Sequence, residues 1–267
     1  MIPKTIHYCW FGRNPKPKLA NKCIKSWKEK CSGYKIVEWN EDSFDIAECP
    51  LYVRQAYEEK KWAFVTDYVR LKVVYDNGGL YFDTDVEVLK SFDNLLSHHS
   101  FFGFEKGKYV ATGLGFGAEK GASILKELMK QYEHIPFLLP DGTADILPCP
   151  QRNIEVFEKN GLILNNSKQV LIDGTVVYPS DYFCPLSWRV KMNKTNNTMS
   201  IHWFSESWKD RDEEKRKRKQ QRKQQHKKNK DILRHLPNAL SKKMLGEYRY
   251  DRMKRKIKHV RNMHLKR

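Results

Sequence analysis

The residues with the clearest chemical meaning are two aspartates two positions apart, Asp83 and Asp85, within residues 80–89. Apolar and polar residues alternate through this segment, which predicts a strand in which alternate side chains share a face. Both carboxylates, with Tyr81 and Glu87, then lie on one face, and the two are roughly 6–7 Å apart by strand rise. Like charges so close need a cation, and a hard divalent ion with oxygen ligands could offset them and also bind phosphate. The alternative is an exposed strand face with solvated acids, because a D-x-D pattern is short.

A second charged pair precedes this segment. Asp67 and Arg70 stand at i, i+3 in a predicted helix over residues 62–76, so they share a helix face. Asn77, Gly78 and Gly79 end that helix and lead directly into the aspartate strand. We therefore expect the four charged groups to converge at one edge of a sheet. The alternative is a surface ion pair, which would contribute only about 0.2–0.5 kcal/mol.

The elements that must position these groups alternate along the first 90 residues. Periodicity and turn residues predict three strands, at residues 5–11, 34–39 and 80–89, and two helices, at residues 19–31 and 62–76. This β-α-β-α-β order predicts an α/β fold with a mainly parallel central sheet. Farther on, the pattern predicts short strands at 101–104 and 113–118, a helix at 122–132, and a mixture of short strands and loops over 137–200. The glycines of residues 113–117 do not continue into a phosphate-binding loop sequence, and we expect a close backbone approach near the donor or acceptor there.

Charge divides the chain into two parts. The net charge is +18, but residues 209–267 carry +17 of it and residues 1–208 are nearly neutral at +1. We therefore predict a folded domain over 1–208 and a polybasic, partly amphipathic C-terminal tail over 209–267, hereafter the basic tail. A nucleic-acid binder acting through the basic tail is an alternative, but the neutral domain argues against it, and we expect no nucleic-acid partner.

Cysteine spacing and hydropathy bear on the expected cellular compartment of the protein. The six cysteines form no C-x-x-C pair, so a zinc site is not expected, and they are predicted to be free thiols. The sequence has no signal-peptide pattern and no apolar run of about 18 residues. From these observations we expect a cytoplasmic protein.

Several spaced motifs resemble glycosyltransferase family 32, a family with a DXD-motif sugar-binding region found in bacterial capsular and surface polysaccharide enzymes. The motifs are IPKTIHYCWFG at 2–12, AFVTDYVR at 63–70, GGLYFDTD at 78–85, YPSDYFCP at 178–185 and IHWFSESW at 201–208. The resemblance covers residues 1–208 and leaves out the basic tail. It implies a GT-A-type nucleotide-sugar-binding fold, Mn²⁺ (or Mg²⁺), and transfer with retention of anomeric configuration.

The resemblance also implies roles for individual residues. Asp83 would contact the donor ribose and the metal, and Asp85 would bind the metal. His202 is a candidate ligand of the metal or of the diphosphate. Asp67 and Arg70 would hold hydroxyls of the donor sugar. The residues expected at the nucleotide-diphosphate part of the donor are Trp10, which would stack on the base, Tyr81, Ser207 and Trp208. The alternatives for Trp10 and His202 are ordinary core packing.

The predicted activity is thus a metal-dependent transfer of a sugar from a nucleotide-sugar donor to a lipid-linked or oligosaccharide acceptor in surface polysaccharide biosynthesis. The basic tail would hold the enzyme on an anionic membrane, at the inner face of the cell membrane. A charged solubilising tail or one that packs on a partner protein is the alternative. A metal-dependent nucleotidyltransferase or phosphatase also uses paired aspartates and stays open as a second enzyme class.

Overall fold

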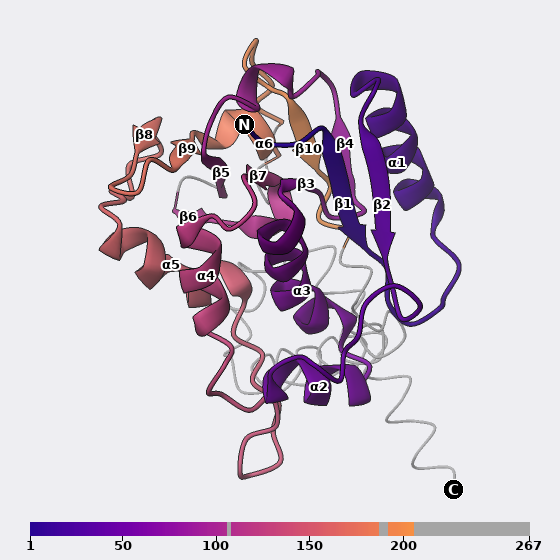
Figure 1. Cartoon of the computed structure of the whole chain (residues 1–267). Coiled ribbons are helices and arrows are strands. Elements are labelled where there is room, and N and C mark those ends of the chain that lie inside the picture. Colours follow the sequence, from indigo (N-terminus) through magenta and orange to yellow (C-terminus); the bar gives the residue numbers. More distant parts are fainter. Residues whose placement is uncertain (106–107, 187–191, 206–267) are drawn as a thin grey trace, which may run out of the picture. The chain divides into compact units, whose positions relative to one another are not determined.

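The structure is a computed structural model that describes residues 1–105, 108–186 and 192–205 (Figure 1). The basic tail lies outside the described residues, as do Ser207 and Trp208. The domain boundary at residue 208 therefore stays a prediction.

The described residues contain a central sheet of eight strands in the order β2-β1-β3-β7-β5-β9-β8, with β6 paired to β5. Strands β1, β2 and β3 are parallel, and so are β5 and β9. Because β7 is antiparallel to both β3 and β5, these five strands share one direction, and only β6, β7 and β8 oppose it. The predicted α/β class with a mainly parallel sheet is confirmed. The strands are β1 Thr5–Cys9, β2 Lys35–Trp39, β3 Gly79–Tyr81, β5 Ser100–Glu105, β6 Tyr109–Val110, β7 Phe116–Ala118, β8 Gln169–Val170 and β9 Val176–Tyr178.

Helices cover both faces of this sheet. The described helices are α1 Lys18–Lys30, α2 Leu51–Glu58, α3 Trp62–Asn77, α4 Ser123–Lys130, α5 Cys149–Lys159 and α6 Ser180–Phe183, with short 3₁₀ turns η1 Asp93–Leu95 and η2 Thr112–Leu114. One apolar cluster joins α2, α3, α4 and α5 to one face, and a second joins α1 and α6 to the other. Neighbouring strand residues divide between them: Phe101 packs in the second cluster and Phe102 in the first. This is the layered arrangement that burial of both faces requires.

Helix α1 shows how sequence spacing sets these contacts. Its buried residues Ala20, Cys23 and Trp27 recur every three or four positions and form one apolar face. The buried Trp27 indole N–H donates to the Val86 carbonyl, and the Ser26 hydroxyl accepts from the Val88 N–H. Helix α1 therefore packs on the chain that follows the aspartate pair and fixes its position.

The Gly78–Gly79 turn behaves as predicted. Gly78 closes α3 with φ of 69° and Gly79 has φ of 115°, values that only glycine adopts easily. A Cβ on Gly79 would lie 2.7 Å from the Thr5 carbonyl oxygen. The close approach lets β3 start directly after α3 and pair with β1, so both ends of this connection are fixed.

The predicted strand over residues 80–89 is wrong as a single element. Pairing stops after Tyr81, residues 84–85 form a turn, and a separate strand β4 (Val86–Val88) follows. β4 leaves the central sheet and pairs antiparallel with β10 (Ser200–His202) in a second sheet. Alternating sequence favours an extended chain but cannot reveal that the chain changes its partner strand between Tyr81 and Val86.

Three helices, α2, α5 and the four-residue α6, lie where the sequence pattern did not predict them. α5 occupies part of the region 137–200 that we expected to contain only short strands and loops, and α2 follows Pro50. Proline at the start of a helix loses no intrahelical hydrogen bond, so Pro150 opens α5 rather than breaking it. In residues 113–118, η2 precedes the strand β7, so the predicted strand is only its second half.

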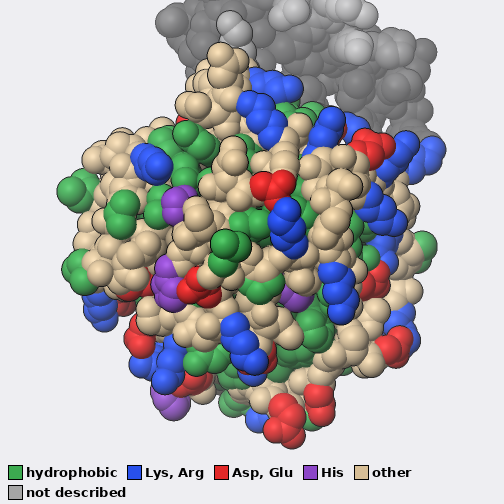
Figure 2. Space-filling view, turned by 45° about the horizontal axis from the view of Figure 1, so that its top comes forward, with side chains coloured by type: hydrophobic (Ala, Val, Ile, Leu, Met, Phe, Trp, Pro, Cys, Tyr) green, Lys and Arg blue, Asp and Glu red, His purple; other side chains and the backbone are tan. Residues whose placement is uncertain are grey.

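The surface agrees with the near-neutral charge of residues 1–208. On the face shown in Figure 2, acidic and basic side chains of the described residues are interspersed rather than segregated. Among the described helices, none combines the length and the apolar character needed to span a bilayer.

Candidate active site

The two aspartates converge although they do not share a strand. Asp83 follows the end of β3, and the Val86 N–H donates to the Asp83 carbonyl at 3.0 Å, which closes the turn that carries Asp85. β10 adds His202, which stands opposite Val86 in the register. One ligand atom from each of Asp83, Asp85 and His202 lies within 4.8 Å of the others. The turn therefore brings together the three predicted metal ligands.

Asp85 is held ionised in this cluster. Its carboxylate lies 3.1 Å from His202 Nε2 and accepts the Ser205 backbone N–H at 2.8 Å. Burial alone would raise the pKa of Asp85, but the charge and hydrogen bonds of these two neighbours lower it overall. Burial likewise works against a charged His202, and the Asp85 carboxylate outweighs it and raises the pKa of the imidazole. A positive charge is thus favoured beside Asp85.

The second predicted pair lies on the buried side of the same site. Arg70 Nη2 donates to Asp67 Oδ1 at 2.8 Å and lies 3.7 Å from Asp83 Oδ1. The guanidinium is 5% exposed, so this is a buried ion pair and not the solvated surface pair that was the alternative. Burial raises the pKa of both Asp67 and Asp83, while the Arg70 charge acts in the opposite direction on each. One guanidinium therefore holds two carboxylates, one from α3 and one from the end of β3.

Tyr81 lies on the side of Asp83 as predicted, whereas the contacts of Glu87 are with other side chains. Tyr81 is buried in the apolar cluster that includes α3, and its hydroxyl donates to the Asp83 carboxylate at 3.0 Å. Glu87 instead pairs with Lys22 and accepts the Trp203 indole N–H, both at 2.9 Å. Phe82, Val86 and Val88 all pack in the apolar cluster of α1 and α6, so their alternation holds although the strand is interrupted.

Comparison with known proteins gives these residues a context. Residues 17–102 match the family described as a glycosyltransferase sugar-binding region containing a DXD motif. The region includes Asp67, Arg70, Asp83 and Asp85, the four charged residues that converge, while Trp10 and His202 lie outside the matched residues.

Two solved structures are similar to this chain. One is the PaToxG glycosyltransferase, at 17% identity over 59% of this chain and 69% of that chain, with a TM-score of 0.46. The other is a glycosyltransferase involved in the glycosylation of the major capsid of PBCV-1, at 18% identity over 78% of this chain and 97% of that chain, with a TM-score of 0.44. No curated protein matches the chain.

Trp10 precedes the matched residues 17–102 in the sequence and directly follows the carboxyl end of β1. Its backbone N–H donates to the Trp39 carbonyl, and its indole N–H donates to the Asn14 carbonyl at 2.6 Å. The ring is partly buried, and the Lys16 ammonium lies 5.7 Å from it. Strands β1 and β3 are parallel neighbours, so Trp10 and Asp83 follow strands that end at the same sheet edge. Base stacking by Trp10 stays a prediction, as do the roles of Ser207 and Trp208.

Groups that we did not predict complete the site around Arg70. Arg70 Nη1 donates to the Thr112 hydroxyl at 3.4 Å, and Cys149 lies behind Thr112. A Cβ on Gly113 would lie 2.4 Å from Asp83 Oδ2 and 3.1 Å from Arg70 Nη1. The backbone at Gly113 therefore lies close to Asp83 and Arg70, and the predicted approach to the donor or acceptor stays a prediction. Residue type identified that glycine, whereas nothing in the sequence marks Thr112 or Cys149.

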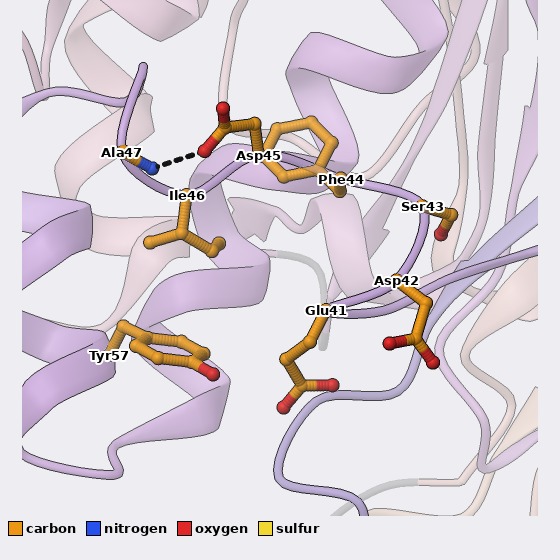
Figure 3. Close-up of a pocket in the computed structure, with 8 residues that line it drawn as sticks. All are labelled: Glu41, Asp42, Ser43, Phe44, Asp45, Ile46, Ala47 and Tyr57. Atoms are coloured by element: carbon orange, nitrogen blue, oxygen red, sulfur yellow. Dashed lines mark hydrogen bonds between the residues drawn. The ribbon is translucent and has the colours of Figure 1, made fainter.

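A surface hollow of about 460 Å³ lies on the connection after β2 (Figure 3). It contains none of the predicted site residues. Asp45 accepts a hydrogen bond from the Ala47 N–H there, and Asp42 forms an ion pair with Arg13. Both carboxylates therefore already have partners within the protein. The lining residues are Glu41, Asp42, Ser43, Phe44, Asp45, Ile46, Ala47 and Tyr57.

The donor set fits the predicted cation. Two carboxylates and one imidazole are suitable ligands for a divalent ion such as Mn²⁺. They differ from the thiolate ligands that are common in structural zinc sites. The raised pKa of His202 shows that the carboxylates favour a positive charge in this cluster. A bound ion would take the place of the imidazole proton, because only the neutral imidazole binds a metal. Among the described residues, the buried Nδ1 atom of His202 has no hydrogen-bond partner, and Nε2 is the atom that faces Asp85.

Proposed function

We propose that this protein is a glycosyltransferase that uses a divalent cation to transfer a sugar from a nucleoside-diphosphate sugar to a glycan acceptor. The observation that carries the proposal is the convergence of Asp83, Asp85 and His202 beside the buried Asp67–Arg70 pair. Asp83, Asp85 and His202 would hold the ion, Mn²⁺ or Mg²⁺. When bound, such an ion offsets the charge that develops on the leaving diphosphate.

The protein's own residues supply binding and orientation. Asp67 accepts and Arg70 donates hydrogen bonds, so together they can bind neighbouring sugar hydroxyls. Their rigid, buried pairing would hold the sugar in one orientation relative to the carboxylates. Trp10 would stack on the base at the same sheet edge. Retention of anomeric configuration belongs to the proposal through the resemblance to family 32.

The acceptor and location extend the proposal. We propose a lipid-linked or oligosaccharide acceptor in surface polysaccharide synthesis, with the enzyme peripheral on the cytoplasmic face of the cell membrane. The support is the basic tail, which carries a net charge of +17 and can be attracted to anionic lipid.

A donor screen tests the activity. The protein is incubated with a panel of nucleotide sugars and Mn²⁺, and free nucleoside diphosphate is measured with and without candidate acceptors. We expect one donor to release its nucleoside diphosphate, and chelation of the metal to stop the release. Release of pyrophosphate or inorganic phosphate instead would favour the nucleotidyltransferase or phosphatase alternative.

A further inference from the structure

The buried side chain of His7 joins the turn before β3 to the neighbouring strand β2. His7 belongs to β1, which lies between β2 and β3 in the central sheet, and it is 2% exposed. Its Nε2 atom lies 2.9 Å from the Gly78 carbonyl oxygen, and its Nδ1 atom lies 3.0 Å from the Trp39 indole nitrogen. Both ring nitrogens therefore have a partner, one at the end of α3 and one on β2.

The chemistry of these two partners decides which ring nitrogen of His7 carries the proton. An indole nitrogen can only donate a hydrogen bond, so Nδ1 of His7 must accept from Trp39. In the neutral ring the proton is then on Nε2, which donates to the Gly78 carbonyl. Burial lowers the pKa of His7 and the charge of Lys35 lowers it further, while the bond to Gly78 acts in the opposite direction. The neutral ring in this one tautomer satisfies both partners.

The main chain of His7 holds the other end of β3. His7 is the partner of Tyr81 in the parallel register, and its carbonyl accepts the Phe82 N–H at 3.1 Å. Phe82 directly precedes Asp83 in the sequence. Because β3 is only three residues long, a single residue of β1 holds the chain on both sides of it, at Gly78 and at Phe82.

The turn before β3 fits closely around the His7 ring. A Cβ on Gly79 would lie 3.0 Å from His7 Nε2, so the imidazole occupies the space that a side chain there would need. Helix α3, which carries Asp67 and Arg70, ends at this turn. The turn and β3 are therefore the covalent connection that sets the place of Asp83 relative to the Asp67–Arg70 pair.

We propose that His7 is a positioning residue of the candidate active site, which fixes Asp83 relative to the Asp67–Arg70 pair by holding both ends of β3. This inference rests on the proposed function and deepens it. In this role His7 touches neither the substrate nor the cation and acts through the backbone of β3. Its side chain contributes the hydrogen bond at the start of β3, and the indole on β2 keeps the ring in the orientation that this bond needs.

Two substitutions of His7 separate its hydrogen bonds from the space that its ring fills. His7→Leu removes both bonds, and we expect kcat with the donor found in the screen to fall about tenfold to a hundredfold, because misplacement of about 1 Å in a catalytic site has effects of that size. KM for the donor at saturating Mn²⁺ should change less, since the groups proposed to bind the base and the sugar keep their own contacts. His7→Gln keeps a donor and an acceptor and should restore a large part of kcat. The rise in melting temperature on adding Mn²⁺ should follow the same order, largest in the wild type and smallest in His7→Leu.

Thr175→Val is the matched control for loss of a buried hydrogen bond. It removes the 2.6 Å bond between the hydroxyls of Thr175 and Ser100, both buried, which joins the residue before β9 to β5. We expect this variant to lose melting temperature while kcat and the response to Mn²⁺ stay as in the wild type. If His7→Leu does not fold, Trp39→Phe takes its place, because it removes only the donor to His7 and keeps an aromatic ring, and it should lower kcat in the same direction.

The outcomes distinguish the role of His7 from the proposed function. Equal kcat in the wild type and His7→Leu, the same loss of kcat in Thr175→Val, or no rescue by glutamine would overturn the positioning role. If the wild type responds to none of the nucleotide sugars, the proposed function itself fails, and the melting curves with Mn²⁺ still decide whether His7 affects the cation site. A responding wild type with unaffected His7 variants refutes only the role of His7.

Discussion

At the scale of single residues, one guanidinium explains the arrangement of the site. Arg70 contacts Asp67 and lies close to Asp83, and all three side chains are largely removed from water. Two carboxylates in such a place would repel each other, so we expect Arg70 to stabilise the fold as well as to bind the proposed ligand. Structural and functional roles therefore overlap at this residue, and variants must be chosen to separate them.

Asp85→Asn should abolish turnover while the protein stays folded. The change removes a charge from the cation site and keeps the shape, and loss of such electrostatic stabilisation costs roughly 10²–10³ in rate. Activity with Mn²⁺, together with the shift in melting temperature on adding Mn²⁺, measures the effect. Wild-type activity in the variant would rule out the proposed cation site.

Arg70→Ala and Asp67→Asn should differ in kind. Removing Arg70 leaves buried carboxylates without their partner, and breaking a buried pair costs about 3–5 kcal/mol of stability. Asp67→Asn keeps the shape and should retain nucleoside diphosphate binding while losing the extra affinity that the donor sugar contributes. Thermal denaturation and calorimetry with the diphosphate and the intact donor distinguish the two. Loss of diphosphate binding in a folded Asp67→Asn protein would contradict the role assigned to Asp67.

At the scale of elements, the site depends on where strands end and which loops approach them. β1 and β3 run parallel and present Trp10 and Asp83 at one edge, as carboxyl ends of parallel strands do. The turn after β3 then directs Asp85 toward His202 on β10, and η2 places Gly113 against Asp83. Each of these elements is short, so small backbone changes should be felt at the carboxylates.

Gly113→Ala should reduce activity more than stability. The added methyl would lie 2.4 Å from Asp83 Oδ2, so the carboxylate or η2 must shift. Misplacement of about 1 Å in a catalytic site can cost about a hundredfold in rate. Gly103→Ala is a matched control, because its methyl would lie equally close, 2.4 Å, to Phe183 Cδ2 and not to a residue of the candidate site. Kinetics and melting curves of both variants test the idea, and it fails if Gly113→Ala is fully active.

Trp10→Ala should weaken nucleotide affinity with little effect on metal binding. A lost aromatic stack is worth about 1–3 kcal/mol, by analogy with base stacking in single-strand recognition. The partly buried ring at the end of β1 motivates the test. Titration of nucleoside diphosphate in the presence of Mn²⁺ gives the affinity. A variant that unfolds, with no selective loss of binding, would favour core packing for Trp10 instead.

At the scale of the whole molecule, charge is the property that divides the chain. Residues 1–208 carry a net charge of +1, and the basic tail carries +17. Such a distribution allows catalysis and attachment to be tested separately. Each basic residue near an anionic surface contributes about 1 kcal/mol, so partial engagement would suffice for reversible binding.

Sedimentation with lipid vesicles tests the basic tail. Full-length protein should pellet with anionic vesicles at low salt, be released at high salt, and stay in solution with neutral vesicles. A shortened protein that ends at Trp208 should stay in solution with both kinds yet still release nucleoside diphosphate from the donor. If the two proteins behave alike on vesicles, the proposed membrane role of the basic tail is wrong.

The sequence by itself determined the class of the fold and most of the chemistry. Helical periodicity, the Gly78–Gly79 turn and alternating apolar residues are local signals, and local signals gave β1, α1, β2 and α3 to within a few residues. The spacing of Asp67, Arg70, Asp83 and Asp85 gave the charged site for the same reason. The glycines at 113–117 also indicated that the backbone there lies close to other groups, as it does at Gly113.

Tertiary structure alone decided how those residues meet. Whether residues 80–89 stay in one sheet depends on β10, which lies more than a hundred residues away in the chain. The burial of Arg70, and its contacts through Thr112 to Cys149, depend on α5 and η2 packing beside α3. Pairing partners and burial arise from contacts distant in sequence, and no local pattern records them. A sequence can therefore name the groups of a site, whereas the fold decides which of them touch.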